Sequence, residues 1–301
     1  MNSSASPAAP LNASSSGLLW YLYPVCAASP YAFVFYYGAK VLNLVVGTPC
    51  NVLVVWHIVS RKSDSSTSDV FILNLAILDT YFCLMTPIDL VNRLVIGSGH
   101  IWYFLRFSYG VKDSAPLFLM CICLDRYMAV VHPVIFSRVR DNRLRVGVCV
   151  VVWGLVLGYG VAKSLVQTIQ VQYELFSAII LLAFCIMLFS NISILCVLRR
   201  SVAGKEEMHP VKKRAFRMVL IILAIIVVNY LPPVAILPFS ARYSFADYRC
   251  RILLAVYLLM DLSSSIEPLV YITKMEGCGG GCCGRGEPRN KDGEVEPEHK
   301  T

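Results

Sequence analysis

Charged residues are scarce in this sequence. Asp, Glu, Lys and Arg make up 15% of its 301 residues and 57% are apolar, whereas soluble domains carry about 25% charged residues. A soluble core could not bury so much apolar side chain, so a lipid bilayer is the expected solvent. The net charge of +8 does not indicate nucleic-acid binding, because the basic residues lie between apolar runs and not along one face.

Catalytic and metal-binding motifs are lacking as well. The sequence contains neither H-E-x-x-H nor G-x-S-x-G, the patterns of zinc peptidases and serine hydrolases. Its five histidines fall at the ends of apolar runs, in loops or in the tail: His57, His100, His132, His209 and His299. We therefore expect no enzymatic activity, no metal and no cofactor.

Long apolar runs are abundant instead. Seven of them approach the ~20 residues with which a helix crosses a bilayer, and a barrel strand would need only about half that length. They cover about residues 33–59, 70–91, 102–131, 146–166, 175–198, 218–239 and 253–272. The sequence thus predicts an all-α membrane protein, a bundle of seven transmembrane helices.

Lysine and arginine collect in alternate loops, and loops rich in them stay cytoplasmic. The loops after the first, third and fifth runs are the basic ones. They contain Arg61 and Lys62, then Arg138, Arg140, Arg143 and Arg145, then Arg199, Arg200, Lys205, Lys212, Lys213 and Arg214. The N-terminus should therefore lie outside the cell and the C-terminus in the cytoplasm.

These runs divide the chain into three parts. Residues 1–32 form a Ser/Ala/Pro-rich tail that we expect to be extracellular and disordered, with glycosylation sequons at Asn2 and Asn12. Residues 33–273 form the transmembrane domain, and residues 274–301 a cytoplasmic tail. No cleaved signal peptide is expected. Three cysteines just past the last run are candidates for S-acylation: Cys278, Cys282 and Cys283.

The third run ends in "CICLDRYMAVVHP", residues 121–133. Asp125 and Arg126 place two charges at the edge of a membrane helix, where ionisable side chains are costly and usually functional. One interpretation is a functional switch formed by Asp125, Arg126 and Tyr127. The alternative is that Arg126 only extends toward the lipid headgroups.

Several motifs occur in order on successive runs: Asn51 in "GTPCNVLVV", Asp79 in "NLAILD", Trp102, Asp125-Arg126-Tyr127, Trp153, "NYLPP" (229–233) and "EPLVY" (267–271). In this respect the chain resembles a rhodopsin-like (class A) G-protein-coupled receptor over about residues 33–283. The stretch "LFLMCICLDRYMAVVHP" is similar to the branch whose ligands are nucleotides, lipids and carboxylates.

The resemblance implies an activation switch near the inner face of the plasma membrane. In such receptors the arginine matching Arg126 pairs with the neighbouring acid, here Asp125, at rest, and turns toward a heterotrimeric G protein on activation. The matching positions on the sixth and seventh helices are Tyr230, Pro232, Glu267, Pro268 and Tyr271.

A central polar site follows from the same resemblance. The family positions matching Asp79 and Glu267 hold a sodium ion with a serine, which is Ala115 here. With a helical step of about 100° per residue, residues 108, 112, 115 and 119 share a stripe with Arg126, so Lys112 should point toward Asp79. We hypothesise that Lys112 replaces sodium, in a site completed by Asn51, Ser263 and Ser264. Alternatively, Lys112 faces the ligand cavity.

Cations outnumber acids among the polar residues of the outer half, which suggests a small anionic ligand, because arginine forks match phosphate and carboxylate. Amine receptors of the family have an acid near Ser108, which argues against an amine. The candidate ligand-binding residues are Arg93, Arg106, Ser108, Tyr109, Lys112, Arg249 and Asp261. The expected partners are this ligand, a G protein and membrane lipid.

The family disulfide at the outer end of the third helix is absent, because Ile101 and Trp102 occupy that end. The cysteines on the outer side in this topology are Cys26 and Cys250, and the cell exterior is oxidising. We predict a bond between them, similar to the second disulfide of chemokine and nucleotide receptors. Two free thiols are the alternative.

Helices five and six depart from the family pattern. Ala183 replaces a proline, Asn191 replaces a tyrosine, and Tyr230 replaces a tryptophan or phenylalanine. A non-signalling decoy receptor is therefore an alternative to a G-protein-coupled one. An ion-coupled transporter is a further alternative, since intramembrane ionisable residues can form a relay, although no inverted repeat is visible.

Overall fold

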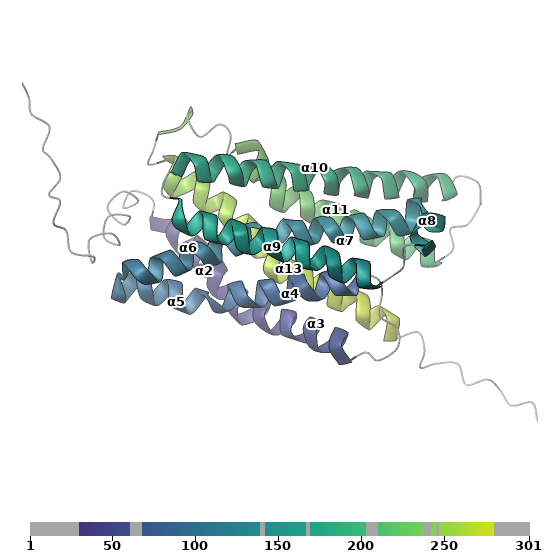
Figure 1. Cartoon of the computed structure of the whole chain (residues 1–301), viewed down its shortest axis with the longest axis horizontal. Helices are drawn as coiled ribbons and strands as arrows, with labels where there is room; N and C mark the ends of the chain where they lie inside the picture. Colours follow the sequence, from purple (N-terminus) through teal and green to yellow (C-terminus); the bar gives the residue numbers. More distant parts are fainter. Residues whose placement is uncertain are drawn as a thin grey trace, which may run out of the picture.

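The computed structural model describes residues 30–60, 68–138, 142–166, 169–202, 210–236, 242–244 and 247–279. Seven helical segments in it are long and apolar enough to cross a membrane, which confirms the predicted bundle (Figure 1). Large apolar side chains such as Val95 and Leu165 are exposed on its outside, as lipid contact requires.

The first three segments are interrupted or bulged helices. The first consists of α2 (Pro30–Leu42), η1 (Asn43–Gly47) and α3 (Thr48–Ser60), and the second of α4 (Asp69–Leu84), α5 (Thr86–Val91) and η2 (Asn92–Ile96). The third consists of α6 (Gly99–Asp113) and α7 (Ala115–Val131), and the short α8 (Pro133–Arg138) follows it. Here η marks a π-helical turn, which inserts a residue into the helix and is frequent at functional sites.

The remaining four segments are α9 (Asn142–Leu165), α10 (Ile169–Val202), α11 (Pro210–Ile236), and η4 (Tyr248–Ile252) with α13 (Leu253–Gly279). Both α10 and α11 extend beyond the apolar runs from which they were predicted. Apolar length locates the part of a helix that crosses lipid, and these helices continue into polar sequence at their ends.

The break between α6 and α7 has a local cause. Pro116 has no N–H to donate to the carbonyl of Lys112, so the regular helical bond is lost there. The chain tightens at Ser114, whose N–H donates to the Val111 carbonyl at 3.2 Å. The register survives the break, because Ser108, Lys112, Ala115 and Leu119 are all buried.

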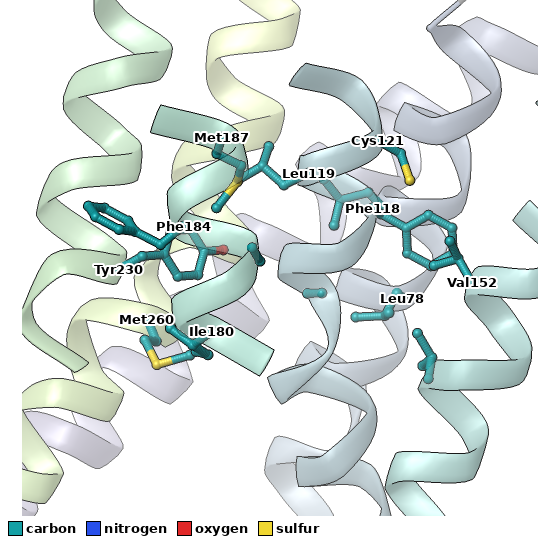
Figure 2. Close-up of a cluster of buried hydrophobic side chains, with 14 of the residues drawn as sticks. Leu78, Phe118, Leu119, Cys121, Val152, Ile180, Phe184, Met187, Tyr230 and Met260 are labelled. Atoms are coloured by element: carbon teal, nitrogen blue, oxygen red, sulfur yellow. The ribbon is translucent and has the colours of Figure 1, made fainter. Parts of the chain in front are cut away.

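The centre of the bundle is apolar. Figure 2 shows the side chains that meet there, among them Phe118 of α7, Met187 of α10 and Tyr230 of α11. Helix α10 packs against both α7 and α11. These side chains form one apolar cluster between the helices.

Two glycines allow α6 and α9 to approach closely. A Cβ atom added at Gly110 would lie 2.7 Å from the Cα atom of Gly160, a separation that real Cβ atoms do not tolerate. Small residues at such crossings let helix backbones touch in membrane proteins. By contrast, Gly154 of α9 has open space where its Cβ would be.

The two ends of the bundle are called here by the helices that mark them. The α5 end lies on the left of Figure 1 and the α8 end on the right. The starts of α4 and α9 and the end of α7 meet at the α8 end, while α5 and the start of α6 lie at the α5 end.

Candidate functional site

A buried lysine lies at the centre of a polar site between α4, α6 and α13. The Nζ atom of Lys112 is 2.8 Å from Asp79 Oδ1 and donates to the hydroxyl groups of Ser264 and Ser263. Ser264 in turn donates to Asp79 Oδ1 at 2.9 Å. Lys112 and Asp79 are 5% and 1% exposed, so this ion pair is removed from solvent. Its short contacts must offset the desolvation penalty of both charges.

Asn51 connects the site to the first transmembrane segment. Its side-chain amide donates to the carbonyl of Ser264 at 2.8 Å and to the carbonyl of Gly47 at 2.9 Å. Gly47 ends the π turn η1, which places α3 against α13.

The site holds two acids and one ammonium group. Asp79 Oδ2 and Glu267 Oε1 are buried and have no hydrogen-bond partner among the described residues. Charges in this site interact strongly because they are buried away from bulk solvent. Lys112 therefore provides the counter-charge for Asp79 directly, and for Glu267 only at longer range.

A cavity of about 510 Å³ extends from this site toward the α8 end. Asp79 and Glu267 line it at one end, and Arg126 and Tyr271 also line it. Its other walls are mainly aliphatic side chains, such as Leu75, Ile226 and Ile194. The proposed switch residue Arg126 and Asp79, the acid of the buried ion pair, thus line one cavity.

Asp125 is held by residues from two other helices. Arg145 Nε of α9 lies 3.0 Å from Asp125 Oδ1, and the Ser68 hydroxyl, just before α4, donates to Asp125 Oδ2 at 2.6 Å. The Arg145 guanidinium carbon also lies 5.3 Å from the ring centre of Phe136 in α8. Sequence analysis assigned Arg145 only to a basic loop and missed this contact.

The other switch residues lie near these groups or in the core. Tyr127 makes a hydrogen bond of 3.2 Å with His132 Nε2, and the Tyr271 hydroxyl donates to Asp69 Oδ1 at 3.5 Å. Tyr230 is buried in the central apolar cluster (Figure 2). Pro232 and Pro268 lie inside α11 and α13. The roles of these residues, and the Asp125–Arg126 pair, stay predictions.

A second charged cluster lies at the α5 end, and its central lysine was missed by sequence analysis. Lys40 of α2 is 2% exposed; its Nζ lies 2.9 Å from Asp89 Oδ2 and 2.9 Å from the Tyr109 hydroxyl. Tyr109 donates to the same Asp89 oxygen, and Arg93 Nε donates to Asp89 Oδ1 at 2.8 Å. The cluster joins α2, α5, η2 and α6.

Aromatic rings surround both cations of this cluster. The Lys40 ammonium lies 4.4 Å from the ring centre of Tyr109 and within 6.0 Å of Tyr36, Tyr37 and Phe82. The Arg93 guanidinium carbon lies 4.8 Å from the ring centre of Trp102 and 5.8 Å from that of Tyr37. Cation–π contacts of this kind stabilise a desolvated charge by up to ~2 kcal/mol.

The remaining ligand candidates are dispersed. Arg106 donates to the carbonyl of Val166, and Ser108 bonds the Tyr81 hydroxyl at 2.8 Å. Asp261 is buried, and its Oδ2 has no hydrogen-bond partner among the described residues. The side chain of Arg249 lies outside the part that the structure describes.

Cys250 is disulfide-bonded, while the seven other described cysteines are free. Its partner lies outside the described residues, as Cys26 does, so the Cys26–Cys250 pairing stays a prediction. Asn2, Asn12, Cys282, Cys283 and the side chain of Cys278 also lie outside them.

The chain is similar to a family of membrane receptors and to several of its members. A model of the 7 transmembrane receptor (rhodopsin family) matches residues 50–174. Human proteinase-activated receptor 2 is 23% identical over 259 residues, which cover 75% of this chain and 65% of that protein. The mouse C-X-C chemokine receptor type 2 is 35% identical over 126 residues (41% of this chain, 34% of the relative). Mouse lysophosphatidic acid receptor 5 is 32% identical over 135 residues (42% and 35%).

The chain is thus similar to the rhodopsin family of seven-transmembrane receptors over residues 50–174. Seven of its described helical segments are long and apolar enough to cross a membrane, as in a multi-pass membrane protein. The chain spans between about one third and two thirds of the length of these three relatives, so what it binds and activates remains to be proposed.

Proposed function

We propose that this receptor binds a small anionic ligand outside the cell and activates a heterotrimeric G protein inside it. The α5 end faces outward and the α8 end faces the cytoplasm, because the lysine- and arginine-rich loops all adjoin the α8 end. The N-terminal tail, residues 1–32, is then extracellular and glycosylated at Asn2 and Asn12. The tail beyond residue 273 is cytoplasmic and acylated at Cys278, Cys282 or Cys283.

One observation carries the signalling part: the cavity that is lined both by Asp79, the acid paired with Lys112, and by Arg126. A ligand-induced shift of α6 relative to α13 changes the hydrogen bonds of Lys112 to Ser263 and Ser264. Because the same cavity borders Arg126, the rearrangement alters the space into which its side chain turns. A buried ion pair contributes little net stability, so modest ligand binding energy is enough to shift its partners.

The charge of the outer cluster supports an anionic ligand. Lys40 and Arg93 both pair with the same acid, Asp89, while the nearest further acid, Asp261, is buried and interacts with Lys40 rather than with Arg93. The Arg93 side chain is 16% exposed, while Lys40 and Asp89 are almost completely buried. With its plane fixed by Trp102 and its Nε used by Asp89, Arg93 presents the charge on which an anionic group docks. Arg106, Ser108, Tyr109, Arg249 and Asp261 would surround the rest of the ligand.

A carboxylate is the simplest anion that the planar guanidinium of Arg93 can bind. Carboxylates are one of the ligand types of the receptor branch that the sequence resembles. The named relatives belong to receptors for different kinds of activator, so they do not select among these ligands.

The ligand proposal is tested by screening carboxylates, phosphates, amines and neutral analogues in cells that report G-protein activation. We expect activation by one or more carboxylates in the wild type and at least tenfold lower potency in Arg93→Gln, the ratio that about 1.4 kcal/mol produces. Arg251→Gln is the matched control, because Arg251 lies at the same end, is half-exposed and forms a local ion pair with Asp247 at 3.2 Å. Activation by amines or neutral compounds alone would refute an anionic ligand.

Ion-coupled transport is the second candidate, favoured by the several buried charged residues within the bundle, such as Lys40, Asp79 and Lys112. Purified receptor in liposomes should show no flux of sodium or protons above that of empty liposomes. Measurable flux that disappears in Asp79→Asn would replace the receptor proposal by a transporter.

A further inference from the structure

At the α8 end, Asp125 is the acid that the switch proposal assigns to Arg126, yet both of its oxygens accept hydrogen bonds from other helices. Oδ1 accepts from Arg145 of α9 at 3.0 Å, and Oδ2 accepts from Ser68 at 2.6 Å. The Asp125 and Arg145 side chains are each 7% exposed. Solvent therefore screens their attraction only weakly.

The directions of the two adjacent side chains differ. Consecutive residues of an α-helix point about 100° apart, so Asp125 and Arg126 leave α7 on different sides. Asp125 points toward the starts of α4 and α9, where Ser68 and Arg145 lie, while Arg126 borders the internal cavity.

Arg145 is itself well fixed. It is 6% exposed, its guanidinium lies against the ring of Phe136, and its backbone belongs to the first turn of α9. A cation fixed in this way keeps the Asp125 carboxylate turned toward α9. It also neutralises part of the negative charge that would attract Arg126.

We propose that Arg145 is a positioning residue that competes with Arg126 for Asp125 and so sets how readily Arg126 is released. Ser68 assists by engaging the second oxygen. The inference rests on the proposed switch function of Arg126, but it makes its own prediction about the side chain of Arg126, independent of any G protein. When the Arg145 charge is removed, Asp125 is available to pair with Arg126 and should hold that side chain more tightly.

The direct test measures the reactivity of Arg126 in purified receptor. A 1,2-dicarbonyl reagent that modifies arginine is added, and the rate of Arg126 modification is followed by peptide mass spectrometry. We expect this rate to fall roughly fivefold in Arg145→Gln, the lower end of common coupling effects between sites. Arg145→Lys should preserve most of the wild-type rate, because the positive charge remains.

Matched variants separate this effect from loss of structure. Arg143→Gln removes the same charge two residues away from an exposed position on the same helix, and should leave the rate unchanged. Ser68→Ala removes the bond to Oδ2 without altering charge and should lower the rate by a smaller factor. It also serves as the test if Arg145→Gln does not fold. An unchanged or faster rate for Arg126 in both Arg145→Gln and Ser68→Ala would overturn the proposal.

Basal G-protein activation of the same variants separates the positioning role of Arg145 from the proposed signalling function. If Arg126 reactivity falls as expected but no variant activates a G protein, the positioning role stands and the proposed function fails. If the wild type activates a G protein but Arg126 reactivity does not depend on Arg145, the function stands and the positioning role fails.

Discussion

Replacing Lys112 by methionine removes the ammonium group from the deep polar site and retains a side chain of similar length. The variant loses the 2.8 Å ion pair with Asp79 and the hydrogen bonds to Ser263 and Ser264. Asp79, only 1% exposed, is left with a buried charge and no counter-charge in contact. Breaking one partner of a buried ion pair destabilises a protein by about 3–5 kcal/mol.

The assay is the thermal denaturation midpoint of purified receptor in detergent. A loss of that size lowers the midpoint by at least about 6 °C, at about 2 °C per kcal/mol for a chain of this order of length. Asp79→Asn should cause a comparable or smaller loss. The double variant Lys112→Met/Asp79→Asn should recover much of the stability, because replacing both members of a buried pair by neutral groups is close to neutral.

Sodium gives a second readout on the same variant. Wild-type receptor should be insensitive to millimolar sodium, because the Lys112 ammonium already lies against Asp79. Lys112→Met should be stabilised by sodium, since a small cation can then replace the ammonium. The reasoning is refuted if the losses of the two single variants simply add in the double variant and the wild type itself responds to sodium.

Two further predictions concern packing and the disulfide. Gly110→Ala places a Cβ atom 2.7 Å from the Gly160 backbone, and should lower the thermal midpoint by an amount equivalent to about 1–3 kcal/mol. Gly154→Ala, which meets open space, should leave the midpoint unchanged. Equal effects of the two substitutions would contradict the close crossing of α6 and α9. Non-reducing peptide mapping should recover Cys250 linked to Cys26, and Cys250→Ser should render Cys26 alkylatable; a Cys26 thiol that is already alkylatable in the wild type would contradict this pairing.

The seven helices could be predicted because a lipid-spanning helix has a fixed minimum length and an apolar composition. Helix ends were less predictable, since α10 and α11 continue past the lipid-spanning sequence. The helical step also placed Lys112 on the inward stripe, and the break at Ser114 did not rotate it away from Asp79.

Lys40 and Arg145 could not be assigned from the sequence. Lys40 is a single cation in an apolar run, and its partner Asp89 is 49 positions away, so no local spacing connects them. The one signal was its occurrence among Tyr36 and Tyr37, within a membrane span, where a charge needs a partner. Arg145 was hidden by the other arginines of its loop, because the rule that predicts orientation from basic residues counts charges without asking which of them is buried.

The central claim is that this receptor signals through Arg126. The most direct test is agonist-free G-protein activation in cells that express wild type or Arg126→Ala at equal surface density. We predict a basal signal in the wild type that falls to the level of untransfected cells in the variant. An equal signal from both proteins, above that level, would contradict the claim.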